Sequence, residues 1–315
     1  MKKLWEFLFL VLIGLVLGFG IVFVKVAYVD KLDEQTQAQQ IVQQMADKEL
    51  GYNVSLDAPV SKTFEIDISS LQEFQYPVKV HNFSGQDATF SLLVYLDYKQ
   101  RKELTVSFEL KNNEEKLVPL HFPVQDLGDG AHALVLSLIA ESNKLTSAAK
   151  EPSEFFGTAG RYTLVKKQGD AFQGAPVPAP SEVTREANGF NGVFLSPDVS
   201  NPDTFKVPPK QVTVKARQPV EFSVRMGGDP EAETYLSWMT LGWQQVPWES
   251  GEPYWFAKVP AGKFAVRTLK FTAPDKPGDY EVASFVAVEP FSMPDSAHVS
   301  RLNVNSSFRF TLHVE

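Results

Sequence analysis

The side chains that most often carry catalysis or bind metals are few and scattered in this sequence. It has no cysteine, and its histidines are His81, His121, His132, His298 and His313. No two histidines have the helical spacing of metal ligands, and there is no G-x-S-x-G, no H-E-x-x-H and no phosphate-binding glycine loop. We therefore expect no catalytic residue, no cofactor and no metal site.

Two weaker arrangements of polar residues could still form a histidine pair or a calcium site. His121 and His132 fall on neighbouring predicted strands and could meet, although two polar positions on an outer sheet face would give the same pattern. Asp198, Asn201 and Asp203 share a loop and could supply oxygen ligands to calcium. Their spacing is not that of a regular calcium loop, and Asx and Pro residues also form ordinary turns.

Aromatic side chains are concentrated in one stretch of the chain. Four of the five tryptophans lie between positions 238 and 255. Trp238 belongs to an alternating strand and is expected to be a core residue, whereas the glycines and prolines that follow it indicate loop. The other rings could form a satellite core, anchor a protein contact, or stack on sugar rings or enter lipid headgroups. The predicted partner-binding residues here are Trp243, Trp248, Tyr254 and Trp255.

An uncharged apolar run at residues 7–24 must position everything downstream. As a helix it would be roughly 27 Å long, close to the thickness of a bilayer's hydrocarbon core. No signal-peptidase pattern and no lipoprotein cysteine follow it, so we expect an uncleaved anchor. Lys2 and Lys3 precede the run, and the positive-inside tendency then places the N-terminus in the cytoplasm and the bulk of the chain outside the cell membrane.

Two glycines within this span could bind another membrane helix. Gly14 and Gly18 form a G-x-x-x-G, which places both on one helix face and allows a second helix to approach closely. Chance is the alternative, because glycine is common in membrane helices. We count both among the predicted partner-binding residues.

Composition restricts the class of protein. An extracytoplasmic chain without cysteine fits a bacterial surface better than a eukaryotic exterior. The formal net charge of −8 argues against nucleic acid as a partner.

The remaining chain divides by texture into an all-β protein with two modules. Residues 1–29 form the cytoplasmic tip and anchor, and the glutamine-rich residues 30–50 predict a helical neck. Residues 51–168 and 182–315 show short alternating runs with turn signals, typical of antiparallel β-sandwiches. Between them, residues 169–181 are a proline-rich linker.

The two modules also resemble each other. Leu120 to Pro123 followed by Gly130 to Leu134 is similar to Leu269 to Thr272 followed by Gly278 to Val282. The segment from Val78 to Asn82 before a glycine turn, together with Gly-Asp-Tyr-Glu-Val at Gly278 to Val282, resembles bacterial immunoglobulin-like domains of the surface-adhesion type. That resemblance implies two immunoglobulin-like, extracytoplasmic modules that bind or space without catalysis.

The sequence thus favours a non-catalytic subunit or accessory protein of a bacterial envelope complex. It would be held in the membrane by its span and would contact other envelope or membrane proteins. The alternative is an adhesion protein that binds cell-wall polysaccharide.

Overall fold

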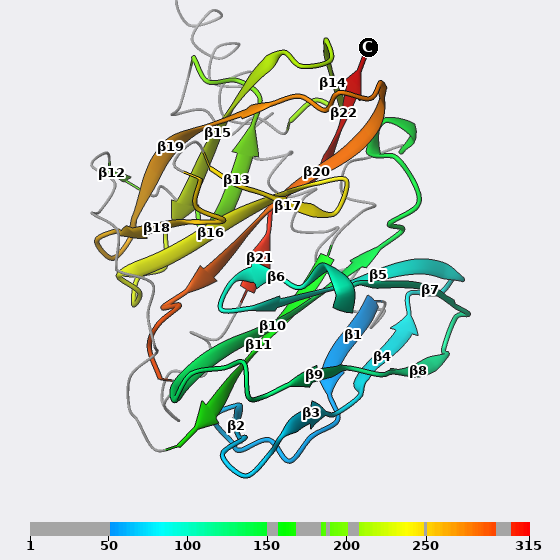
Figure 1. Ribbon diagram of the computed structural model, residues 1–315. Coiled ribbons are helices and arrows are strands. Elements are labelled where there is room, and N and C mark those ends of the chain that lie inside the picture. Colours follow the sequence, from blue (N-terminus) through cyan, green and yellow to red (C-terminus); the bar gives the residue numbers. More distant parts are fainter. Residues whose placement is uncertain are drawn as a thin grey trace, which may run out of the picture. The chain divides into compact units, whose positions relative to one another are not determined.

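The alternating runs fold into strands throughout the described part of the chain. The structure, a computed structural model, describes residues 51–149, 157–167, 184–186, 190–200, 208–248, 251–293 and 304–315. The elements of the first module are β1 (Gly51–Leu56), β2 (Glu65–Asp67), β3 (Glu73–Gln75), β4 (Val78–Phe83), β5 (Ala88–Leu96), β6 (Lys99–Gln100), η2 (Lys102–Leu104), β7 (Val106–Leu110), β8 (Glu115–Val118), β9 (His121–Pro123), β10 (Gly130–Ala140), η3 (Thr146–Ala148) and β11 (Gly157–Lys166) (Figure 1). Those of the second module are β12 (Thr184–Glu186), β13 (Gly192–Ser196), β14 (Gln211–Val214), β15 (Pro219–Gly227), β16 (Thr234–Leu241), β17 (Gln244–Val246), β18 (Trp255–Lys258), β19 (Lys263–Thr272), β20 (Gly278–Val288), β21 (Val304–Ser306) and β22 (Phe310–Val314).

The first module is a β-sandwich. One layer has the order β2-β11-β10-β5-β6, with β7 also paired to β5. The facing layer consists of β1-β4-β8 and the two-stranded sheet β3-β9. Because side chains alternate along a strand, residues such as Leu134 and Leu136 of β10 point between the layers. There they form one core with Val80 of β4 and Phe90 of β5.

The second module repeats the strand pairing of the first, with β12 beside β19 and β21 beside β20 as additional strands. Its larger layer has the order β14-β22-β20-β16-β17, with β18 paired to β16 and β21 to β20, and β13, β15 and β19 pair as β1, β4 and β8 do. In both modules the first strand of the larger layer runs parallel to the last long strand, as β2 does to β11 and β14 to β22. Gly130 and Gly278 begin the equivalent strands β10 and β20. The internal repeat expected from the sequence is therefore confirmed, as is the all-β fold.

The two larger layers are apolar on both faces. Every residue of β10 is buried, and β16 and β20 are buried over most of their length. The outward faces of these layers meet in a third apolar cluster, which we call the seam. Its buried members are Leu93, Tyr95, Tyr98, Ala133, Val135 and Ile139 from the first module and Leu236, Trp238, Tyr254, Phe256, Ala283, Phe285, Ala287 and Val304 from the second. Residues Tyr52–Glu315 accordingly form one compact unit.

Some predicted strands are interrupted, and some observed strands were not predicted. Sequence alternation predicts single strands at residues 75–82 and 115–122. The structure divides the first at Pro77 into β3 and β4 and the second at Pro119 into β8 and β9. Proline has no N–H to donate to a ladder, so such breaks are expected where it interrupts a strand. The strands β1, β6, β12, β17 and β18 were not predicted.

The predicted membrane elements and linker lie outside the described residues. These are the span at 7–24 with Gly14 and Gly18, the neck at 30–50 and the linker at 169–181. Within the described residues, no helix is long and apolar enough to cross a bilayer. The anchor, the neck and the domain boundaries remain predictions.

Candidate functional site

Three of the four predicted contact residues in the aromatic stretch are buried within the chain itself. Trp248 and Trp255 belong to the core of the second sandwich, and their ring centroids lie 5.7 Å apart. Tyr254 is buried in the seam. The role of these rings in binding a partner remains a prediction.

Trp243 lies where the second module meets the first. It follows Gly242 in a two-residue turn between β16 and β17, and both residues have positive φ, as in a type I′ hairpin. The indole N–H donates to the carbonyl of Ser142 over 3.0 Å, and the guanidinium of Arg309 lies 5.3 Å from the ring centroid. Trp243 thus attaches its hairpin to the loop that follows β10. Its role as an outside contact also remains a prediction.

An equivalent turn in the first module enters the seam. Asp97 and Tyr98 connect β5 to β6, again with positive φ at both positions. The buried hydroxyl of Tyr98 donates to the carbonyl of Pro290 over 2.7 Å and accepts from Nη1 of Arg161 over 3.0 Å. Trp238 packs 5.8 Å from the Tyr98 ring. Trp238 is therefore buried, as expected, but in the seam and not in the interior of its own sandwich.

Two glutamines join the equivalent hairpins by reciprocal hydrogen bonds. The backbone N–H of Gln100 donates to Oε1 of Gln245 over 2.7 Å, and the N–H of Gln245 donates to Oε1 of Gln100 over 2.6 Å. Both side-chain amides also donate to backbone carbonyls, including that of Trp243 at 2.8 Å. These hydrogen bonds therefore join the two modules at the polar edge of the seam.

A buried ion pair lies beside the Trp243 turn, where the N–H of Gly242 donates to the carbonyl of Glu281. Arg309 and Glu281 are each less than 5% exposed, and Nε of Arg309 lies 3.1 Å from Oε2 of Glu281. Arg309 also donates to the carbonyls of Ala140 and Glu141 in the first module. The carboxylate of Glu281 accepts from the N–H and hydroxyl of Thr146. Burial lowers the pKa of Arg309 to about 10, against the opposing effect of Glu281.

His132 is held between two acceptors at the base of the Asp97 turn. Its Nδ1 lies 2.8 Å from the Asp97 carboxylate and its Nε2 lies 3.0 Å from the carbonyl of Gly128. Two acceptors suit the doubly protonated ring. The hydrogen bond to Asp97 raises the pKa of His132, against the effects of burial and of Lys166. His121, by contrast, pairs with Glu73 on strands β3 and β9, so the two histidines do not meet.

This geometry predicts a stability that depends on pH. Because the folded-state pKa of His132 is raised, its contribution is fully present below the unfolded value of about 6.5 and is lost as the pH rises through the folded value. The difference in unfolding free energy between wild type and His132→Gln should therefore shrink as the pH increases over that range. Urea titrations at several pH values measure it. A difference that stays constant or grows with pH would contradict the assignment.

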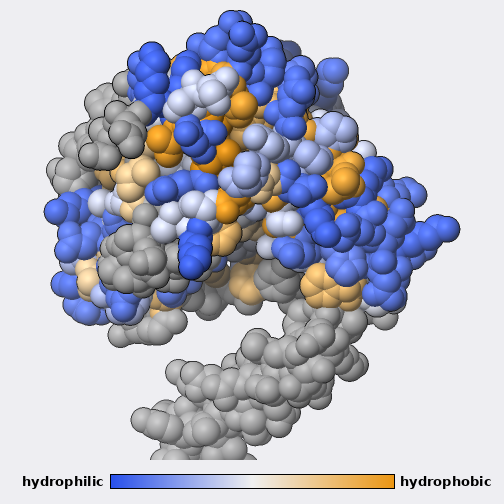
Figure 2. All heavy atoms as spheres, turned by 90° about the horizontal axis from the view of Figure 1, so that it is seen from below, coloured by the Kyte–Doolittle hydropathy of each residue, from blue (hydrophilic) through white to orange (hydrophobic). Residues whose placement is uncertain are grey.

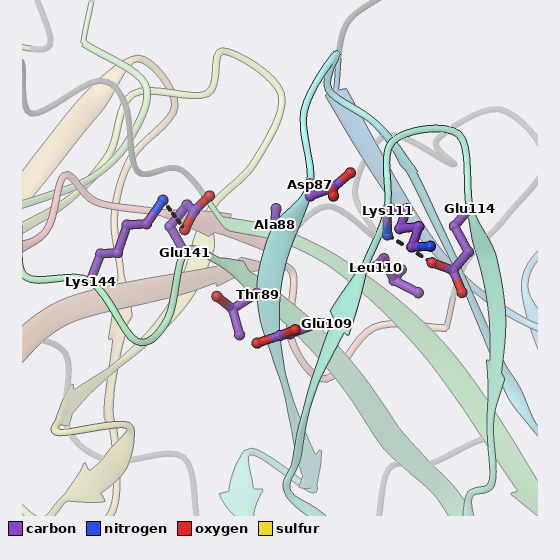
Figure 3. Close-up of a pocket in the computed structure, with 9 residues that line it drawn as sticks. All are labelled: Asp87, Ala88, Thr89, Glu109, Leu110, Lys111, Glu114, Glu141 and Lys144. Atoms are coloured by element: carbon purple, nitrogen blue, oxygen red, sulfur yellow. Dashed lines mark hydrogen bonds and ion pairs between the residues drawn. The ribbon is translucent and has the colours of Figure 1, made fainter.

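A polar cavity of about 380 Å³ opens on the first module, between the loop after β10 and the turn after β7 (Figure 3). Its lining comprises Asp87, Ala88, Thr89, Glu109, Leu110, Lys111, Glu114, Glu141 and Lys144. These include four carboxylates and two ammonium groups, so the lining has an excess of negative charge. No aromatic ring is among them, so the cavity lacks a platform for stacking on sugars. No motif in the sequence indicates this site.

The surface seen in Figure 2 is mostly hydrophilic, with apolar side chains in separate areas. Among the described residues, the most exposed large apolar side chains are Phe64 (39%), Val106 (37%), Leu117 (51%) and Val199 (38%), which lie in different parts of the chain. Large apolar side chains that are exposed are therefore few among the described residues.

The described residues contain no group of three or more side chains placed to hold a metal ion. Asp198 of the candidate calcium loop accepts from the N–H and hydroxyl of Ser200, as in an ordinary Asx turn. Asn201 and Asp203 lie outside the described residues.

Comparisons with known proteins give no family. No family model matches the chain, and no curated protein does. Among solved structures, it is similar to a transglutaminase of red sea bream, at 12% identity and a TM-score of 0.24, over 84% of this chain and 31% of that one. It is also similar to a CARDB domain from Pyrococcus furiosus (14% identity, TM-score 0.25, 40% and 90% covered).

A third similarity is to the chaperone and tip-adhesion subunit complex of Acinetobacter baumannii Csu pili (9% identity, TM-score 0.27, 84% and 99% covered). At these TM-scores the similarities carry no argument about function. The description of the fold rests on the sheet topology.

Proposed function

We propose that this chain is a non-catalytic, membrane-anchored subunit or accessory protein of a bacterial envelope complex, which holds a partner protein through its paired sandwiches. The observation that carries the proposal is the seam. Two sandwiches with a common pattern of strand pairing are joined by a buried apolar cluster, reciprocal glutamine bonds and a buried ion pair. Such a pair offers a partner surfaces whose relative positions are fixed, as a scaffold or accessory subunit requires.

In this proposal the predicted span holds the chain at the cell membrane. Because the uncharged run at 7–24 would hold the sandwiches at the membrane, its Gly14 and Gly18 face is available to a membrane helix of the same complex. The polysaccharide-binding alternative needs accessible rings, and the described structure buries three of the four that were predicted to provide them. It remains a prediction that no further observation favours.

The test is purification from the native membrane after mild cross-linking. We expect the chain to be recovered with a partner in a fixed ratio, and we expect Gly14→Leu combined with Gly18→Leu to reduce that ratio. Ala27→Leu, a similar apolar enlargement just beyond the span, serves as the control and should leave it unchanged. A chain that purifies alone after cross-linking would contradict the proposal.

A further inference from the structure

Equivalent glutamates follow the longest strand of each module. Glu141 follows β10 and Glu289 follows β20, both with positive φ, at 52° and 45°. The N–H of Glu141 donates to the carbonyl of Thr89 over 2.7 Å, and the N–H of Glu289 donates to that of Thr234 over 2.9 Å. Glutamate therefore occupies the same backbone position in both modules, so the hydrogen bonds of the two carboxylates can be compared directly.

In the second module both carboxylate oxygens of the glutamate accept hydrogen bonds from the chain itself. Oε1 of Glu289 accepts from the backbone N–H groups of Glu233 and Thr234 at 2.7 and 3.0 Å. Oε2 accepts from the hydroxyls of Thr234 and Ser292 at 2.7 and 3.1 Å. Although burial opposes ionisation, these hydrogen bonds hold the pKa of Glu289 below its ordinary value. The chain itself thus supplies every donor that this carboxylate needs.

In the first module the corresponding donors are absent. Glu141 is only 6% exposed, yet neither of its carboxylate oxygens receives a hydrogen bond. The ammonium of Lys144 lies 2.7 Å from Oε2 as an ion pair, but without hydrogen-bond geometry, and Lys144 is 58% exposed. Thr89, the counterpart of Thr234, donates its hydroxyl to Asn143 instead. A buried acceptor without donors is costly, so such a group in a folded protein calls for an explanation.

The polar cavity lies directly at this carboxylate. Figure 3 shows Glu141 and Lys144 at one side, Ala88, Thr89 and Glu109 in the middle, and Lys111 and Glu114 at the other side. Glu109 has no ion-pair or hydrogen-bond partner among the described residues, and Glu114 accepts only from the N–H of Lys111. A group entering the cavity would therefore meet acceptors from two directions.

We propose that this cavity binds a guanidinium or ammonium group carried by an arginine or lysine side chain of a partner protein. Such a group supplies both what Glu141 lacks, N–H donors, and what the acidic lining favours, positive charge. The volume of about 380 Å³ accommodates the head group and part of its aliphatic stem. The charged groups near Glu141 are Lys144, which the ligand would displace, and Arg309, whose charge is already paired with Glu281. That the cation belongs to a side chain of a partner protein rests on the proposed function. That the cavity prefers a cation does not.

The experiment is calorimetric titration of the intact chain in detergent with L-argininamide, and with its uncharged analogue L-citrullinamide. We expect binding of argininamide alone, weakened about tenfold or more by Glu141→Gln. Lys144→Ala should strengthen binding, because it removes the competing ammonium. Glu115→Gln changes an equally charged carboxylate that pairs with Lys79 outside the cavity, and it should have no effect.

Glu109→Gln covers the case in which Glu141→Gln does not fold, because Glu109 is exposed, and it should weaken binding about two- to fivefold. Absence of argininamide binding, or equal binding of citrullinamide, would overturn the proposal. The peptide acetyl-Gly-Arg-Gly-amide tests whether the cavity accepts an arginine side chain that is part of a polypeptide. Peptide binding weaker than that of argininamide would overturn the assignment to a partner protein. Failure of these titrations leaves the cross-linking result intact, so the two proposals can fail separately.

Discussion

Replacing Trp238 with alanine is expected to lower the free energy of unfolding by about 3–5 kcal/mol, the usual cost of removing a large buried ring. The indole is fully buried in the seam and stacks on Phe285 at a centroid distance of 5.5 Å. Tyr95 and Tyr98 of the first module lie 5.2 and 5.8 Å away. Its removal would leave a cavity bounded by both modules, so both should be affected.

Hydrogen exchange locates the effect and distinguishes it from ordinary core damage. In Trp238→Ala, protection should fall in β5 and β10 of the first module as well as in β16 and β20 of the second. The matched control is Phe222→Ala, which removes a buried ring from the interior of the second sandwich, where it contacts Phe271 and Phe310. Its effect should stay within the second module. If Trp238→Ala were equally confined, the seam would not couple the modules.

Local patterning was sufficient to predict most of the strands and the repeat, because alternation and turn residues report on one strand at a time. It did not predict the seam, which depends on how two sheets meet. A signal was nevertheless present in Gly130–Ala140, which is apolar at nearly every position. Such runs are typical of strands buried on both faces, whereas a two-layer sandwich exposed on its outside would alternate.

The aromatic stretch was harder to interpret for a related reason. Glycine and proline correctly indicate loop around Trp243 and Trp248, but loop residues are exposed only when nothing packs over them. Trp248 is covered by the core of its own sandwich. Trp243 is held by Ser142 and Arg309, which lie 101 and 66 positions away in the chain. Contacts over such separations leave no trace in local composition.

The cavity was missed because a single glutamate after a strand has no motif. The repeat offered a route to it, since Gly130–Ala140 and Gly278–Val288 are both 11-residue strands followed by glutamate. Equivalent positions could thus be assigned from the sequence. Only the three-dimensional structure reveals that Glu289 accepts hydrogen bonds and Glu141 does not, and that Thr89 donates its hydroxyl to Asn143 instead.

Replacing Arg309 with methionine is expected to cost about 3–5 kcal/mol, because it leaves the Glu281 carboxylate buried without a compensating charge. Glu281 would retain its hydrogen bonds from Thr146 and Thr311, which offset part of the loss. The carbonyls of Ala140 and Glu141 would also lose their donor. Urea unfolding near neutral pH measures the change.

A double variant separates the charge from the packing. Arg309→Met combined with Glu281→Gln should be more stable than Arg309→Met alone, because the uncompensated charge is gone while an acceptor for the threonine donors remains. The matched control is Arg217→Met, which breaks an ion pair with Asp275 whose side chains are 74% and 69% exposed, and it should cost less than about 1 kcal/mol. If the double variant were as unstable as the sum of its single changes, the pair would act only through volume. Charge pairing would then not be what stabilises this contact between the modules.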